Sequence, residues 1–192
     1  MPKFAIIPVK SFSSGNLRLA SAIGDSRRRA LGQALAGHVA TTVTDSNLTP
    51  LIVTGDPEVV AWAIAGGFQT IPEPGTGLNA AAASGVEWIT KMHNRWIIIH
   101  ADLPLLRLGD LTAVTHETGD VIAPSSDGGT SVLSATRPID FKYGPASFHR
   151  HLPQLDSPTV IARPGMLHDI DSPADLDSAL NHPLGSWLGE FI

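Results

Sequence analysis

A carboxylate follows directly on one of the most apolar stretches of the chain. Residues 96–101 read WIIIHA, and Asp102 comes next, with a proline two residues later. An Asp in this position either caps the next helix or holds a cation. Mg²⁺ prefers one or two carboxylates together with phosphate oxygens and water, so the second interpretation needs another carboxylate. Asp169 and Asp171 in the segment HDIDSPADL are candidates, although Asp171 could instead cap a helix.

Positive charge and small residues meet in the segment PVKSFSSGNLRLA, residues 8–20. Lys10 and Arg18 enclose a Ser/Gly loop whose backbone N–H groups are suited to surround a phosphate. The segment lacks the G-x-x-x-x-G-K-[ST] order of a Walker loop. It is therefore either a phosphate-binding loop of another kind or a plain connector with incidental charges.

Glycines and an asparagine mark the segment EPGTGLNAAA, residues 73–82. Gly75 and Gly77 would let the backbone approach a base or a ribose closely, and Asn79 offers both a donor and an acceptor. The alternative is a plain turn in which Asn79 is the N-cap of a helix.

A second anion site is predicted from DGGTS, residues 127–131, and YGPASFHRH, residues 143–151. Their glycines and Ser147 supply backbone and hydroxyl donors for a carboxylate or a phosphate. His149 and His151 either add positive charge to this site or lie at the surface. The sequence contains neither a zinc-binding histidine pattern nor a G-x-S-x-G hydrolase motif.

Short apolar runs predict the strands that would position these clusters: residues 4–9, 50–55, 68–72, 96–101, 120–125, 131–135 and 159–162. Helical spacing of apolar residues predicts helices at 26–44, 57–65, 79–91, 108–117 and 173–181. Asp56 followed by Pro57 marks the start of the second of these helices. The alternation predicts one domain, residues 1–192, with a parallel-dominated mixed sheet and helices on both faces. Ligands of such folds bind beyond the carboxyl ends of the strands, where nearly all of the polar clusters lie.

Composition excludes several classes of protein. Cys is absent, which excludes disulfides, thiolate metal sites and thiol nucleophiles. The net charge is −5 and no Lys/Arg stripe occurs, so nucleic acid is not an expected partner. Residues 27–29, three arginines, are interpreted as a solvated helix face. No run approaches the ~20 apolar residues of a membrane span, and no signal-peptide pattern is present, so we expect a soluble, cytoplasmic protein without a membrane partner.

Taken in order, six motifs resemble the guanylyltransferases of coenzyme F-420 biosynthesis that act on 2-phospho-L-lactate or phosphoenolpyruvate. They are IIPVK…RLA, GLNAA, ADLPLL, APSSDGGTSVL, YGPASFHRH and DIDSPADL, and together they cover nearly the whole chain. The resemblance implies a GT-A-like, Rossmann-like α/β fold with a β-hairpin-type excursion near the acceptor site. It also implies transfer of GMP from GTP to the phosphate of a three-carbon phospho-acid, with Mg²⁺ as cofactor and release of pyrophosphate. The residues do not identify the acid as phosphoenolpyruvate, 2-phospho-L-lactate or 3-phospho-D-glycerate.

Together with the strand-end clusters, this resemblance assigns roles to individual residues. The predicted catalytic residues are Lys10, Arg18 and Asp102, and the predicted Mg²⁺ pair is Asp102 and Asp171. The predicted nucleotide side comprises Pro8, Lys10, Gly15, Arg18, Gly55, Glu73, Gly77, Leu78 and Asn79. The predicted acceptor side comprises Asp127, Gly128, Gly129, Thr130, Gly144 and Ser147.

One departure from the resemblance concerns Asn16, which stands where a lysine of the triphosphate loop is expected. The missing charge keeps a non-catalytic GTP-binding partner protein open as an alternative function. A nucleotidyltransferase of the cytidylyl or molybdopterin branch is the alternative among enzymes. Expected partners are GTP, the phospho-acid and a downstream transferase that takes the product. A homodimer is a candidate assembly, because the apolar C-terminal segment PLGSWLGEFI needs a cover.

Overall fold

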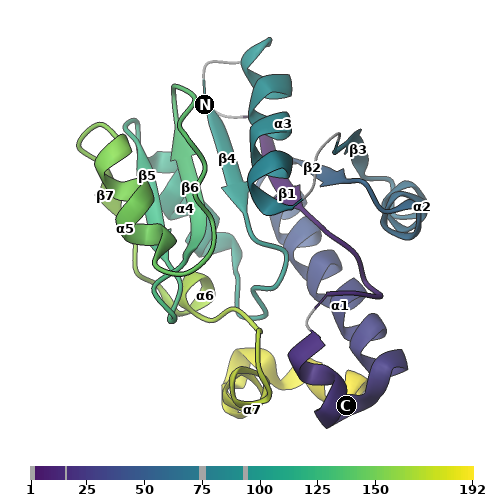
Figure 1. Ribbon diagram of the computed structural model, residues 1–192. Helices are drawn as coiled ribbons and strands as arrows, with labels where there is room; N and C mark the ends of the chain where they lie inside the picture. The colour runs from purple at the N-terminus through teal and green to yellow at the C-terminus, as the bar shows by residue number, and fades with distance from the viewer. Residues whose placement is uncertain (1–2, 16, 74–76, 93–94) are drawn as a thin grey trace.

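One seven-stranded sheet organises the chain in the computed structural model, which describes residues 3–15, 17–73, 77–92 and 95–192 (Figure 1). The strand order is β3-β2-β1-β4-β6-β5-β7. The strands are β1 Phe4–Pro8, β2 Thr49–Thr54, β3 Gln69–Pro72, β4 Trp96–Ile99, β5 Val121–Pro124, β6 Thr130–Ala135 and β7 Thr159–Val160. Each strand coincides with a predicted apolar run, with shifts of one or two residues at the ends. The predicted strands are therefore confirmed.

The five predicted helices are also present. They are α1 Ala20–Asp45, α2 Pro57–Ala65, α3 Leu78–Thr90, α4 Leu108–His116 and α7 Pro173–Asn181. The sequence did not predict the short helices α5 Ser147–His151 and α6 Pro164–Leu167, or the 3-10 helices η1 Leu17–Leu19, η2 Leu152–Gln154 and η3 Pro183–Phe191. Asp56 caps α2 as predicted, because its Oδ1 atom accepts a hydrogen bond from the Glu58 N–H at 2.7 Å.

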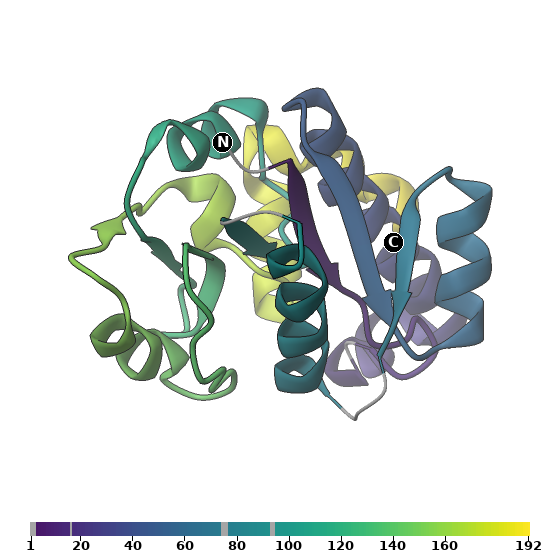
Figure 2. The same cartoon turned by 90° about the horizontal axis from the view of Figure 1, so that it is seen from above.

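Helices cover both faces of the sheet because successive side chains of each strand point to opposite sides (Figure 2). In β1, Ala5 and Ile7 belong to a core shared with α1, α2, α4 and α6, whereas Ile6 belongs to a core shared with α3. The two layers are closely packed. A Cβ atom on Gly85 of α3 would lie 2.6 Å from Cγ2 of Ile6, so only glycine fits there.

The sheet is parallel except at β6, which pairs antiparallel with both β4 and β5. This confirms the predicted parallel-dominated mixed sheet. The reversal has a consequence for function. The first residue of β6, Thr130, lies at the same edge of the sheet as the carboxyl ends of the other strands. A parallel strand would have placed Thr130 at the opposite edge.

The apolar C-terminal segment folds back on its own chain. Leu188 of η3 is 0% exposed and belongs to a core with Leu19 and Leu31, while Trp187 packs against that core and donates a hydrogen bond from Nε1 to the Pro104 carbonyl at 3.2 Å. These residues are thus covered without a second copy of the chain. None of the helices among the described residues is long and apolar enough to cross a membrane.

Candidate active site

Three carboxylates lie together at the carboxyl edge of the sheet, and two of them, Asp169 and Asp171, were candidates for the cation site in the sequence. Asp127, Asp169 and Asp171 each offer an oxygen atom, and these three oxygens lie within 4.8 Å of one another. Asp102 lines the same cavity as all three, and we call these four residues the acidic cluster. Its Oδ1 atom is buried and has no hydrogen-bond partner among the described residues. A buried acceptor without a donor is costly, so the group suits a bound cation.

The electrostatics of this acidic cluster favour the same interpretation. Burial, followed by the negative charges of Asp169 and Asp171, raises the pKa of Asp102 from 3.8 to about 8. Burial also raises the pKa of Asp169 to about 6 and shifts that of Asp171 upward. Asp127 differs, because a hydrogen bond from the Ser125 hydroxyl lowers its pKa. A hard divalent cation would compensate the crowded charge, and carboxylate oxygens are the ligands it prefers.

The alternative role of helix cap is wrong for both predicted metal ligands. The N-cap of α4 is Arg107, five residues beyond Asp102 in the chain. The N-cap of α7 is Ser172, whose Oγ atom accepts a hydrogen bond from the Asp175 N–H at 3.4 Å. Neither Asp102 nor Asp171 is therefore the N-cap of α4 or α7. Asp169, a candidate carboxylate in the sequence, lies near Asp171 and lines the same cavity as Asp102.

The predicted nucleotide side forms a cavity of about 240 Å³ between β1, α1 and α3. Six of the nine residues predicted for the nucleotide line it: Pro8, Lys10, Gly15, Glu73, Gly77 and Leu78. Oε1 of Glu73 is buried here without a hydrogen-bond partner among the described residues. Gly77 is the N-cap of α3 and has a φ of 96°, a conformation that favours glycine.

Two residues to which the sequence drew attention, Asn16 and Gly75, lie outside the described residues.

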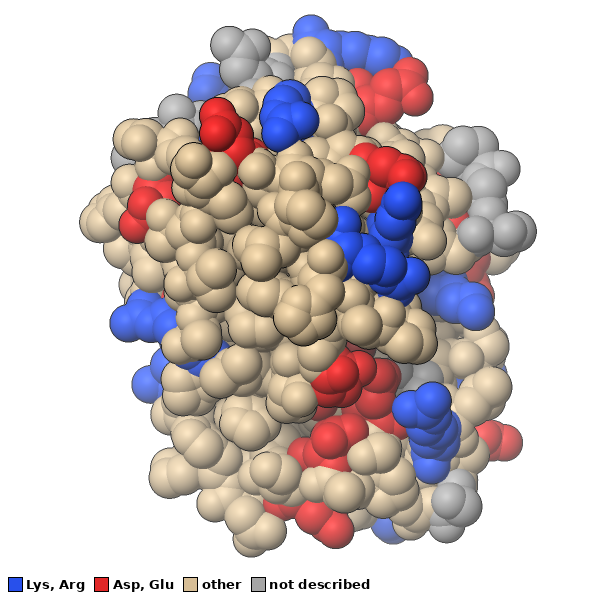
Figure 3. Space-filling model, turned by 60° about the vertical axis from the view of Figure 1, so that its left-hand side comes forward, with Lys and Arg blue, Asp and Glu red and all other residues tan. Residues whose placement is uncertain are grey.

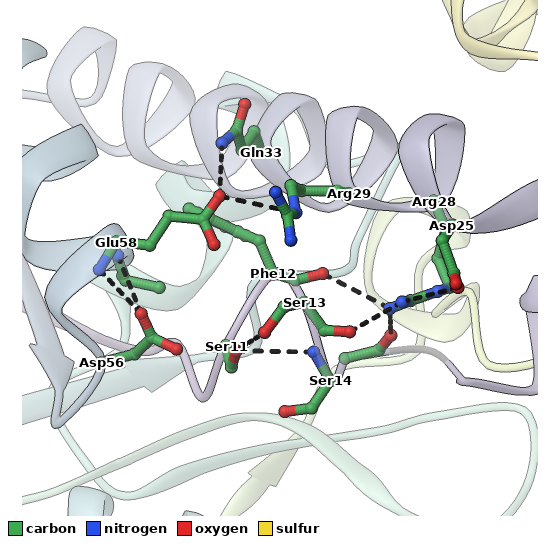
Figure 4. A network of polar contacts seen from close by, with 12 residues as sticks. Ser11, Phe12, Ser13, Ser14, Asp25, Arg28, Arg29, Gln33, Asp56 and Glu58 are labelled. Atoms are coloured by element: carbon green, nitrogen blue, oxygen red, sulfur yellow. Dashed lines mark hydrogen bonds and ion pairs between the residues drawn. The ribbon is translucent and has the colours of Figure 1, made fainter.

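Arg28 is a member of this cavity that the sequence interpretation missed (Figure 4). It was assigned to a solvated helix face, which is wrong, because its side chain is only 4% exposed. Its guanidinium donates to the backbone carbonyls of Phe12 at 3.3 Å, Ser13 at 2.7 Å and Gly15 at 2.5 Å. The loop after β1 is therefore wrapped around a buried positive charge, with these carbonyls turned toward Arg28. Arg27 is exposed, as predicted.

The predicted acceptor side forms a second cavity, of about 190 Å³. Five of its six predicted residues line it: Asp127, Gly129, Thr130, Gly144 and Ser147. They come from the β5–β6 turn and from the start of α5, so the antiparallel β6 brings them together. Thr130 and Ser147 are 1% exposed, and their hydroxyls are hydrogen-bonded to each other at 3.2 Å.

The two cavities meet at three shared lining residues, Leu78, His100 and Asp102. The sequence did not single out His100. Its Nε2 atom is buried without a hydrogen-bond partner among the described residues, and burial lowers its pKa to about 4. Its ring is therefore neutral near pH 7. The only sequence signal for it was its place immediately before Ala101 and Asp102 at the end of a buried strand.

Four predicted site residues lie beside the cavities without lining them: Arg18, Gly55, Asn79 and Gly128. Arg18 is exposed, and its positive charge lowers the pKa of Asp171 against the upward effect of burial. Asn79 is the second residue of α3 and not its N-cap. Its Oδ1 atom accepts a hydrogen bond from the Tyr143 N–H at 2.7 Å, which ties the nucleotide side to the acceptor loop.

Charge on the surface is mixed. The face shown in Figure 3 carries Lys and Arg side chains in separate groups, together with a group of Asp and Glu side chains in its lower half. A continuous basic stripe, which the phosphates of a nucleic acid would require, is not seen on this face.

Comparison with known proteins decides the family. Residues 3–163 match the family described as "Guanylyl transferase CofC like". The chain belongs to this family. The CofC-like match ends before Asp169 and Asp171, so the placement of these two carboxylates at the site is supported by their geometry and not by the family match.

Relatives extend the similarity over the remainder of the chain. A phosphoenolpyruvate guanylyltransferase from Sphaerobacter thermophilus is 32% identical, with 99% of each chain covered. A 2-phospho-L-lactate guanylyltransferase from Methanothermobacter thermautotrophicus is 26% identical, with 100% of this chain and 90% of that protein covered. A solved structure of a proposed nucleotide-diphospho-sugar transferase from Desulfovibrio desulfuricans G20 has a TM-score of 0.72 at 16% identity, with 99% and 95% covered. The last similarity confirms the predicted nucleotidyltransferase fold.

Proposed function

We propose that this CofC-like protein transfers GMP from GTP to the phosphate of a three-carbon phospho-acid in coenzyme F-420 biosynthesis, with release of pyrophosphate. One observation carries the proposal: the cavity predicted for the nucleotide and the cavity predicted for the acceptor meet at Asp102, a member of the acidic cluster. Phosphoenolpyruvate and 2-phospho-L-lactate are the first acids to test, because similar proteins carry those names.

The reaction needs no general base. An oxygen of the acceptor phosphate, already ionised near pH 7, attacks the α-phosphorus of GTP in line and forms a new P–O–P bridge. The bond between the α-phosphorus and its bridging oxygen breaks, and pyrophosphate leaves with the electron pair. Catalysis then consists of placing the two phosphates and compensating their charge. Lys10 and Arg18 are proposed to act on the triphosphate, and Arg28 shapes the loop beneath it.

The acidic cluster is the proposed site of Mg²⁺. Asp102 and Asp171 are the proposed ligands, and Asp169 lies close enough to Asp171 to join them. The unpartnered Oδ1 of Asp102 and its raised pKa show how poorly the bare cluster is compensated. When bound, the cation would neutralise charge on the transferring and leaving phosphates. In this proposal the chain's own carboxylates would hold the cation at the junction of the two cavities.

A substrate matrix tests the function. Purified protein with Mg²⁺ is given each of the four nucleoside triphosphates, alone and with phosphoenolpyruvate, 2-phospho-L-lactate or 3-phospho-D-glycerate, and pyrophosphate is measured. We expect release only with GTP and one or two of the acids. Release with CTP would favour the cytidylyl branch, and tight GTP binding without product under any acid would favour a non-catalytic protein. Mass spectrometry of the product then shows whether a GMP group has been added.

A further inference from the structure

A histidine is completely buried behind the acceptor cavity. His151, the last residue of α5, is 0% exposed, and the ring of Tyr143 packs against it edge to face with 4.8 Å between centroids. The sequence interpretations, an added positive charge or a surface residue, are both wrong for His151. Burial, with the positive charge of Arg150, lowers its pKa to about 4. The ring is therefore neutral near pH 7 and carries one N–H proton.

The position of that proton follows from the two hydrogen bonds of the ring. Nε2 lies 2.9 Å from the backbone N–H of Lys142, and Nδ1 lies 3.0 Å from Oγ1 of Thr130. A backbone N–H only donates, so Nε2 is the acceptor and holds a lone pair. The single proton of the neutral ring is consequently on Nδ1, and Nδ1–H donates to the Thr130 hydroxyl oxygen.

This arrangement determines what the Thr130 hydroxyl offers to a ligand. Its oxygen accepts from His151 Nδ1–H and also from the Ser147 hydroxyl at 3.2 Å, which uses both of its lone pairs. No acceptor for its own proton is found among the described residues. Thr130 lines the acceptor cavity, so the free proton is available to a ligand there.

We propose that His151 is a positioning residue that holds the Thr130 hydroxyl as a donor toward an anionic oxygen of the acceptor acid, without touching the acid itself. The identity of the acid rests on the proposed function, whereas the locked donor rests on the hydrogen bonds alone. A hydroxyl with both lone pairs occupied favours a ligand oxygen that has no hydrogen of its own, such as that of a carboxylate or phosphate. His151 thereby contributes to selecting an anion without contributing charge.

Four variants separate this role from a general effect on folding. Thr130→Val removes the donor, and His151→Phe removes the group that orients it. His151→Asn keeps an amide donor near the position of Nδ1, and His149→Asn changes an exposed histidine on the same helix as the matched control. The dissociation constant for phosphoenolpyruvate is measured by calorimetry in the presence of Mg²⁺. Michaelis constants for the acid and for GTP are measured in parallel, with thermal unfolding to confirm the fold.

We expect Thr130→Val to weaken acid binding by roughly ten- to a hundredfold, as for loss of a hydrogen bond to a charged group. His151→Phe should weaken it roughly tenfold, His151→Asn by no more than about threefold, and His149→Asn not at all. The Michaelis constant for GTP should stay constant. The double variant His151→Phe/Thr130→Val should bind the acid no worse than Thr130→Val alone, because both act through one hydroxyl. Additive losses, or equal losses for GTP and acid, would overturn the proposal.

A spectroscopic measurement tests the hydrogen-bond arrangement without turnover. In protein labelled with ¹⁵N-histidine, long-range ¹H–¹⁵N spectra should show His151 as the neutral Nδ1–H tautomer, assigned by its loss in His151→Phe. An Nε2–H tautomer or a charged ring would overturn the proposal whatever the enzyme's substrate. Conversely, the expected tautomer and acid binding without release of pyrophosphate would contradict the proposed function and leave the role of His151 intact. Wild-type protein that binds none of the acids would contradict both.

Discussion

The two cavities that meet at Asp102 differ in the charged residues that line them. The nucleotide cavity is lined by Lys10 and Arg28 together with the carboxylates of Glu73 and Asp102, and Arg28 is also paired with Asp25 at 3.1 Å. The acceptor cavity carries the acidic cluster instead, and its buried histidine is neutral. Of the two sets of lining residues, only that of the nucleotide cavity includes Lys or Arg.

Because four carboxylates line the second cavity, the proposed function requires a cation there before a phosphate can approach them. Under the proposed function, charge compensation is thus divided between the cavities: Lys and Arg side chains act on the nucleotide side, and the proposed cation with oriented neutral donors acts on the acceptor side. Variants on each side should then fail in different ways.

The largest effect is expected at the junction. Asp102→Asn should lower kcat by roughly a thousandfold or more, because a ligand of the proposed cation is lost. The same change should leave the metal-free protein at least as stable as the wild type, since the raised pKa of Asp102 shows that its negative charge is unfavourable there. Pyrophosphate release and thermal unfolding in EDTA measure the two effects. Asp177→Asn, an exposed position on α7, is the control, and normal turnover by Asp102→Asn would refute the assignment.

A smaller and more selective effect is expected from Arg28. Arg28→Gln should raise the Michaelis constant for GTP by roughly ten- to thirtyfold, because three loop carbonyls lose charge-assisted hydrogen bonds and the cavity loses a charge. The Michaelis constant for the acid should hardly change. Arg27→Gln removes an identical charge from the neighbouring exposed position and should have no effect. If both Michaelis constants rise together in Arg28→Gln, the division between the cavities is wrong.

Lys10 should contribute less, because it is exposed and water screens its charge. Lys10→Gln is expected to raise the Michaelis constant for GTP by roughly three- to tenfold at low salt. The difference from the wild type should shrink as the salt concentration rises. Lys3→Gln serves as the control, because Lys3 is exposed and immediately precedes β1, at the end of that strand opposite to Lys10. A loss that is insensitive to salt would show that Lys10 acts by direct hydrogen bonding and not through long-range charge.

The smallest effect concerns stability and pH. In the metal-free protein the pKa values of Asp102 and Asp169 are about 8 and about 6, above the 3.8 of an unperturbed Asp. The folded state thus binds these protons more tightly than the unfolded state, and this contribution to stability is lost as pH rises through that window. In EDTA, the melting temperature should fall by a few degrees between about pH 5 and about pH 8. Both Mg²⁺ and Asp102→Asn should reduce this fall in melting temperature. If neither does, the pH dependence of the melting temperature originates outside the acidic cluster.

Much of the arrangement was accessible from the sequence because it depends on local signals. Apolar runs of strand length and helical spacing between them predicted every strand among the described residues and the five longer α-helices, since burial on a pleat or on one helix face imposes those periods. The rule that ligands bind at the carboxyl ends of strands brought Lys10, Glu73 and Asp102 to one edge. The resemblance to a known family then separated a nucleotide group from an acceptor group.

Other features depended on contacts between distant parts of the chain. Arg28 could not be distinguished from Arg27 in the sequence, because its burial results from carbonyls up to 16 residues away that face it only once the loop has folded back. The tautomer of His151 depends on a backbone N–H from Lys142 and a hydroxyl from β6.

The sequence by itself determined the strands, the five longer α-helices and the grouping of most candidate site residues at one edge of the sheet, because these follow from residue type and spacing along the chain. Its motifs carried the resemblance to the family. The tertiary structure alone decided which carboxylates crowd together, which arginine is buried and which groups are hydrogen-bonded to the hydroxyl of Thr130. Those properties are set by burial and by hydrogen-bond partners, and both are defined only when the strands and loops have come together.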